Sequence, residues 1–141
     1  MAGTAKLKNV EAQIHNDKLD IDNAASLYAS LLSIPADGRY PDSNATPQQL
    51  KDQTLIMLNA HILALAARQP ILIVFEDIHW ADLTSIELMD LIITSSSDRR
   101  VMMVLTYRPE FQPTWVGESQ VSALVLNKLS VDNCTPLIEG I

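Results

Sequence analysis

The stretch Ile71-Leu-Ile-Val-Phe-Glu-Asp-Ile-His-Trp-Ala-Asp82 decides the fold. It begins with a continuous apolar run that is rich in β-branched residues and shows no alternation. Such a run predicts a strand buried on both faces, as in the middle of a parallel sheet. Glu76 and Asp77 end the run abruptly. Asp82 stands where it can cap a following helix.

A strand–helix–strand unit follows from the residues after this stretch. Thr84 and Glu87 have the spacing of a capping box, which predicts the start of a helix that extends to about Thr94. The apolar run from Val101 to Tyr107 predicts a second strand. A helix between two strands is the crossover that parallel pairing requires, so we expect a βαβ unit.

Two further elements are expected towards the end of the chain. Residues 121–126 (Val121 to Leu126) form an apolar segment that predicts a third strand, and residues 130–141 predict the start of one more helix. The expected fold class is therefore α/β, with parallel strands and flanking helices.

The first part of the chain, residues 1–69, predicts helices. Apolar residues recur at helical spacing within residues 7–14, 24–32 and 55–65. The last of these helices has a strong start signal, because Thr46 and Gln49 can form a capping box around Pro47. It is expected to end near Arg68. The N-terminal third is thus predicted to be helical.

Composition limits the classes of function. The 141 residues allow one compact domain, and 17 acidic against 10 basic side chains argue against a nucleic-acid-binding surface. The single cysteine cannot form an internal disulfide. Neither a signal peptide nor an apolar run of the roughly 20 residues that span a bilayer is visible. We therefore expect a cytoplasmic protein without membrane contact.

Polar side chains follow both predicted strands of the βαβ unit. Glu76 and Asp77 end the first strand, and Thr106 and Arg108 follow the second. Ligands bind beyond the carboxyl ends of strands in open α/β sheets. An apolar strand that ends in two acids is typical of a Walker B element, where one carboxylate binds Mg²⁺ and another orients the attacking water. The alternative is a solvated turn, with Arg108 as an ordinary surface arginine.

Several other motifs are absent from the sequence. The 4 glycines are isolated, so neither GxGxxG nor GxxxxGK[ST] occurs. The histidines lack metal-ligand spacing, and no GxSxG elbow is present. His79 and Trp80 have two interpretations, either facing a ligand or packed within their loop.

Residues 71–82, continued by Leu83-Thr-Ser-Ile-Glu-Leu-Met-Asp-Leu91, resemble the ATPase module of the AAA+/STAND group. The resemblance is strongest to bacterial multidomain proteins that combine a class III adenylate/guanylate cyclase domain, this ATPase and TPR repeats. Three more stretches match the same family: Ser33-Ile-Pro-Ala-Asp-Gly-Arg-Tyr-Pro41, Leu65-Ala-Ala-Arg-Gln-Pro70 and Val104-Leu-Thr-Tyr-Arg-Pro-Glu-Phe111.

The resemblance implies a P-loop NTPase fold with Mg-ATP as its ligand, acting as a regulatory switch. Glu76 and Asp77 take the acidic Walker B positions, with Asp77 nearer to Mg²⁺ or its water. Many P-loop ATPases have Asp at the first of these positions, which leaves the division of roles between the two acids open. Thr106 and Arg108 match the nucleotide-sensing position.

The family's Walker A loop precedes everything that matches here. Residues 1–141 therefore resemble a partial ATPase domain, with the Walker B and sensor region at 70–129. We expect such a chain to hold Mg-ATP poorly and to be inactive alone, with ATP and the rest of the domain or parent protein as partners. It is expected to be a fragment, a truncated reading frame or a gene remnant. The alternatives are a non-enzymatic remnant that acts as an interaction module through its helical N-terminal third, and a fragment of a large STAND-type transcriptional regulator.

Overall fold

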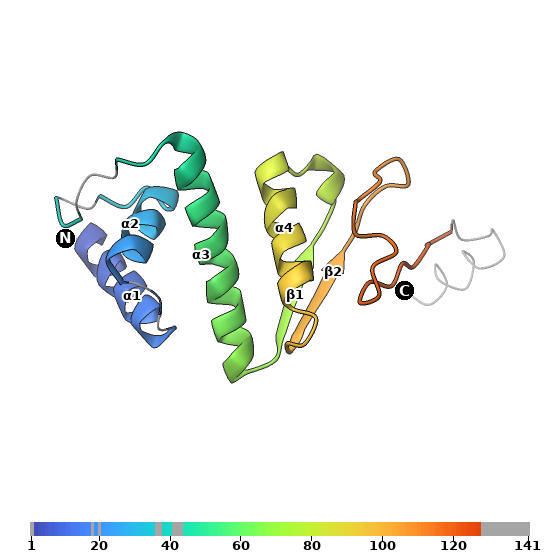
Figure 1. Cartoon of the computed structure of the whole chain (residues 1–141), viewed down its shortest axis with the longest axis horizontal. Coiled ribbons are helices and arrows are strands. Elements are labelled where there is room, and N and C mark those ends of the chain that lie inside the picture. The colour runs from blue at the N-terminus through green and yellow to red at the C-terminus, as the bar shows by residue number, and fades with distance from the viewer. Residues whose placement is uncertain (1, 18, 20, 36–37, 41–43, 128–141) are drawn as a thin grey trace, which may run out of the picture. The chain divides into compact units, whose positions relative to one another are not determined.

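The computed structural model describes residues 2–17, 19, 21–35, 38–40 and 44–127. The chain divides into two compact units, residues 1–111 and 112–141. The described part of the first unit holds four α-helices, one 3-10 helix and two strands (Figure 1). The expected α/β class with a helical N-terminal part is therefore confirmed.

Three helices build the N-terminal part: α1 (Ala2–Asn16), α2 (Ile21–Leu31) and α3 (Pro47–Arg68). Helix α1 packs on α2, and α2 packs on α3. Their apolar stripes meet in one core, as the spacing predicts. The buried members of this core are Ile14, Ala24, Ala25, Leu27 and Met57.

Helix α3 begins and ends where the sequence predicts. Thr46 Oγ1 accepts a hydrogen bond from the Gln49 N–H, and Gln49 Oε1 accepts one from the Thr46 N–H (3.3 and 2.8 Å). This capping box satisfies two amides that the first turn leaves without helical partners. Helix α3 also packs against α4 (Leu83–Ser95), where Lys51 forms an ion pair with Glu87 at 2.7 Å.

The predicted βαβ unit is confirmed. Strands β1 (Ile71–Phe75) and β2 (Val101–Leu105) are parallel, and Phe75 lies opposite Leu105. The 3-10 helix η1 (Ile78–Trp80) and helix α4 connect them. Strand β2 ends at Leu105, two residues before the predicted Tyr107.

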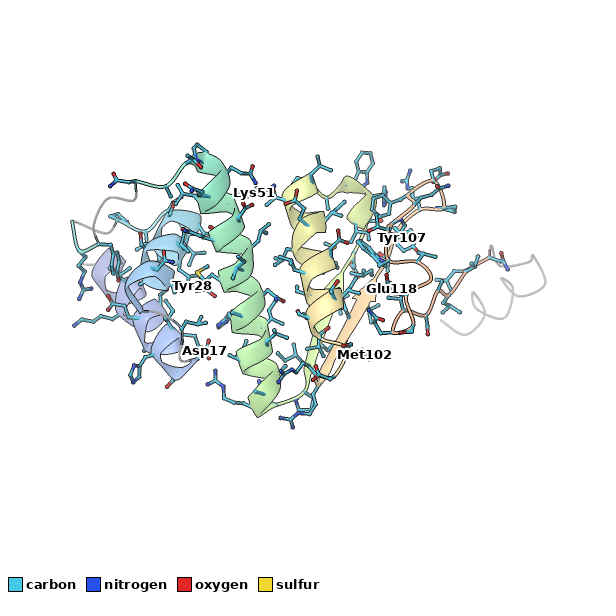
Figure 2. All side chains as sticks on the ribbon, viewed as in Figure 1. Asp17, Tyr28, Lys51, Met102, Tyr107 and Glu118 are labelled. Carbon is cyan, nitrogen blue, oxygen red and sulfur yellow. The ribbon has the colours of Figure 1, made fainter. Side chains whose placement is uncertain are left out.

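The burial of β1 differs from the prediction. Alternate residues are exposed instead of buried on both faces. Leu72 is 63% exposed, and Met102 on β2, which Figure 2 labels, is 65% exposed. The described residues form a sheet of two strands, and the crossover helix α4 can cover one face of it. We call the other side the open sheet face; it consists of Leu72, Val74, Met102 and Val104.

The prediction of a third strand is wrong. Residues 121–127 contain no strand, and Leu124, Val125 and Leu126 are exposed. An apolar run becomes a strand only where a neighbour accepts its backbone hydrogen bonds. The helix predicted for 130–141 lies outside the described residues. Among the helices that the structure describes, none is long and apolar enough to cross a membrane.

Candidate functional site at the carboxyl ends of the strands

Thr106 joins the ends of the two strands. Its N–H donates to the carbonyl of Phe75, and its own carbonyl accepts from the N–H of Ile78, each at 3.0 Å. Its side-chain Oγ1 accepts from the N–H of Asp77, also at 3.0 Å. The turn after β1 is therefore held against the end of β2 by both the backbone and the hydroxyl of one residue.

Asp77 adopts a left-handed backbone conformation, with φ +53° and ψ +43°. This conformation is uncommon for residues with a side chain, and Asp and Asn are among those that tolerate it best. It turns the chain out of β1 and into η1, and it leaves the Asp77 side chain 73% exposed. Glu76 is also exposed. The structure therefore places both predicted acids at the end of β1, with the backbone of Asp77 fixed by Thr106.

His79 lies beside Asp77, and the sequence assigned it no definite role. Its Nδ1 is 3.9 Å from Asp77 Oδ1, a distance too long for a hydrogen bond, and its side chain is 11% exposed. Neither ring nitrogen has a hydrogen-bond partner among the described residues. Leaving such atoms unpaired costs free energy, so His79 is a candidate functional residue. Its position two residues after Asp77 is the signal that could have identified it.

The aromatic neighbour of His79 faces solvent. The rings of His79 and Trp80 lie 5.2 Å apart and are tilted by 43°. Trp80 itself is exposed. Of the two interpretations that the sequence left open, packing within the loop describes His79, whereas Trp80 presents its indole at the surface beside the site.

Arg108 is exposed, two residues beyond Thr106. Its carbonyl accepts a hydrogen bond from the Phe111 N–H at 3.0 Å, and the Tyr107 ring contacts Phe111 edge-on. The loop that carries Arg108 is thus stabilised by contacts among its own residues, 107–111. Among the described residues, the structure brings Asp77 and Thr106 together, but no hydrogen bond or ion pair links the Arg108 guanidinium to either of them.

Asp82 caps α4, as the sequence predicts. Its carboxylate accepts from the N–H and the hydroxyl of Ser85 at 3.0 and 2.9 Å. These hydrogen bonds to the charged form lower the pKa of Asp82. The capping box predicted from Thr84 and Glu87 is wrong, because the helix already begins at Leu83 and Glu87 pairs with Lys51 instead.

The oxygen atoms at this edge suit a metal-bound phosphate. Carboxylate and hydroxyl oxygens are the ligand type that Mg²⁺ prefers, and Mg²⁺ commonly takes one or two carboxylates together with substrate phosphates. No group of three or more His, Cys, Asp or Glu side chains that could hold a metal occurs within the described residues. Asp77 and Thr106 are the residues at this edge whose oxygen atoms could hold such an ion.

We call Glu76, Asp77, Thr106 and Arg108, at the carboxyl ends of the two strands, the carboxyl edge; all four are exposed. Shallow hollows of about 180 Å³ and about 370 Å³ lie between α2 and α3 and between α3 and α4, and neither is lined by a residue of the carboxyl edge.

Comparisons with known proteins add one distant relative. No family model and no solved structure matches the chain. An uncharacterized protein of Rhizobium meliloti (strain 1021) is 28% identical over 97 residues, which are 69% of this chain and 9% of that protein. The chain thus matches a small part of a much longer protein, and the match assigns neither a family nor an activity.

Proposed function

We propose that this chain is the Walker B and sensor part of a P-loop ATPase module of the AAA+/STAND type, in a cyclase-linked signalling protein. The observation that carries the proposal is the hydrogen bond from the Asp77 N–H to Thr106 Oγ1. It ties the acid at the end of one parallel strand to a polar side chain at the end of the next. Ligands of open α/β sheets bind at this edge.

Each residue of the edge has a distinct task in this proposal. Asp77, whose backbone N–H is hydrogen-bonded to Thr106 Oγ1, would hold Mg²⁺ or its bound water. Glu76 would be the supporting acid. Thr106 and Arg108 would contact the phosphates, and His79 lies beside the Asp77 carboxylate, with its Nδ1 3.9 Å from Oδ1. Mg-ATP supplies the phosphoryl group and the charge of the metal when it is bound.

The chain alone is proposed to be inactive. Its 141 residues contain no GxxxxGK[ST] loop, and the carboxyl edge is exposed to water. Phosphoryl transfer depends on donors that surround the developing charge in a site that excludes water.

ATP hydrolysis by the longest polypeptide that the gene encodes tests this function. Asp77→Asn keeps the side-chain size and removes the charge, and we expect it to lower kcat about 100-fold or more, as loss of one key electrostatic contact does. Asp98→Asn is the matched control. Asp98 is an exposed acid in the loop before β2, at the opposite edge of the sheet, and its substitution should leave kcat unchanged.

Two results would contradict the proposal. Equal kcat values for Asp77→Asn and Asp98→Asn would show that Asp77 has no part in ATP hydrolysis. ATP hydrolysis by the isolated chain, lost in Asp77→Ala, would show that the edge needs no further residues and would overturn the proposed inactivity.

The open sheet face favours a second candidate, a non-enzymatic interaction module. Leu72, Val74, Met102 and Val104 form an exposed apolar surface on adjacent strands. Contiguous apolar patches of this kind mark interaction sites. A complex of defined stoichiometry that is lost in Met102→Glu, while Asp77→Asn leaves it intact, would favour this candidate over the ATPase module.

A further inference from the structure

His79 is a buried side chain whose hydrogen-bonding groups are unused. Its side chain is 11% exposed, and both ring nitrogens are shielded from water without a hydrogen-bond partner among the described residues. A neutral imidazole carries one N–H donor and one acceptor, so burying both without partners costs free energy. The packing of the described residues therefore does not explain why a histidine stands at this position.

The turn that carries His79 is held firmly beside the end of β1. Ile78 is buried, and its N–H donates to the carbonyl of Thr106 at 3.0 Å. The N–H of Trp80 donates to the carbonyl of Asp77 at 2.9 Å and closes the turn around His79. The ring of His79 packs against that of Trp80 at 5.2 Å. His79 therefore has little freedom to move towards a distant partner.

Asp77 supplies an acceptor close to this ring. Its Oδ1 lies 3.9 Å from His79 Nδ1, which exceeds the usual hydrogen-bond length by about 1 Å. The side chain of Asp77 is 73% exposed, whereas its backbone N–H is bound to Thr106 Oγ1. Rotation of the exposed carboxylate about its side-chain bonds can therefore close the gap while the backbone stays in place.

We propose that His79 is a positioning residue for Asp77: its Nδ1–H donates to Oδ1 of the carboxylate and leaves Oδ2 to hold Mg²⁺ or its bound water. Thr106 then fixes the backbone of the acid, and His79 fixes its side chain. Carboxylates that bind metals are commonly oriented by such a hydrogen bond from a neighbouring group. The inference rests on the proposed function of Asp77, but the hydrogen bond itself can be measured without a nucleotide.

The tautomer of His79 in the 141-residue chain tests this hydrogen bond. NMR of the ring nitrogens at about pH 8.5, where free imidazole is uncharged, shows which of them carries the proton. We expect the proton of His79 on Nδ1, because a carboxylate beside that nitrogen selects this tautomer. His15, which is exposed on α1, provides the signals of an imidazole in water for comparison.

Two variants show whether Asp77 is the acceptor. Asp77→Gly removes the carboxylate and keeps a residue that suits the left-handed backbone, so His79 should lose its preference for a proton on Nδ1. Asp98→Gly, at an exposed acid in the loop before β2, is the matched control and should leave the signals of His79 unchanged. A wild-type ring protonated on Nε2, or a preference for Nδ1 that persists in Asp77→Gly, would overturn the inference. If Asp77→Gly does not fold, the wild-type tautomer still decides.

Two substitutions of His79 separate positioning from packing in the longest polypeptide that the gene encodes. The amide nitrogen of Asn lies as many bonds from Cα as Nδ1 does, whereas that of Gln corresponds to Nε2. His79→Gln should lower kcat for ATP about 10–100-fold, as loss of a hydrogen bond to a metal ligand does, and His79→Asn should retain most of it.

The outcomes distinguish this inference from the proposed function. Equal losses in His79→Gln and His79→Asn would show that the ring only packs. Wild-type kcat in His79→Gln, with kcat lost in Asp77→Asn, would overturn the inference and leave the proposed function intact. Wild-type kcat in Asp77→Asn would overturn the proposed function, and the tautomer of His79 would then decide whether this ring holds the Asp77 side chain.

Discussion

Thr106 controls the geometry of the carboxyl edge, because its backbone and its hydroxyl bond to successive residues of the turn after β1. The sequence predicts that Asp77 and Thr106 end neighbouring strands. It does not predict their contact, which depends on the register that places Phe75 opposite Leu105. The burial of His79 depends in addition on the left-handed backbone of Asp77, which no hydrophobic pattern encodes.

The N-cap Asp82 leads to a pH-dependent prediction. Hydrogen bonds from Ser85 lower the folded-state pKa of Asp82 below its usual 3.8, so its contribution to stability is present above that value and is lost as the pH falls through the folded pKa. Asp82→Asn retains a capping side chain without a titrating group. We expect the free energy of unfolding of the wild type to fall more steeply than that of Asp82→Asn below about pH 4.

Urea unfolding followed by circular dichroism at a series of acidic pH values measures this difference. Ser85→Ala removes the hydroxyl donor and keeps the N–H donor, so its dependence on pH should be intermediate. If the free energy of unfolding changed equally with pH in the wild type and in Asp82→Asn, the ionised Asp82 cap would not be the source of the pH dependence.

The strands show what an apolar run can and cannot predict. Ile71–Phe75 forms a strand, as expected, but residues 121–126, which are also mostly apolar, do not. The difference is the presence of a paired neighbour, a property of the tertiary structure rather than of the segment. Strand β1 has a paired neighbour but is exposed on one face although its sequence suits burial on both, because no described element covers Leu72 and Val74.

The two sides of the βαβ unit should respond differently to substitution. Ile92 of α4 is 0% exposed, so Ile92→Ala should lower the free energy of unfolding by about 2–5 kcal/mol. Leu72→Thr on the open sheet face should change it by less than about 0.5 kcal/mol, because that side chain is already in water. Urea unfolding of the isolated chain measures both. A loss in Leu72→Thr as large as in Ile92→Ala would show that the face is covered.

The chain as a whole combines a helical part with a βαβ unit whose edge carries acidic and polar side chains. Helical periodicity and the capping box at Thr46 were sufficient to predict the first. The apolar runs at 71–75 and 101–105, with a helix between them, predicted the βαβ unit. The P-loop assignment remains a proposal, because the described residues form two strands and the relative in Rhizobium meliloti matches over 9% of its own length.

Line broadening by Mn²⁺-ATP tests the central proposal most directly. Mn²⁺ shares the preference of Mg²⁺ for carboxylate and phosphate oxygens and broadens the NMR signals of nearby amides. We predict weak, millimolar binding that broadens the amides of Asp77 and Thr106 before those of α1 and α2, and that is lost in Asp77→Asn. Broadening that spares the carboxyl edge, or that persists unchanged in Asp77→Asn, would contradict the account.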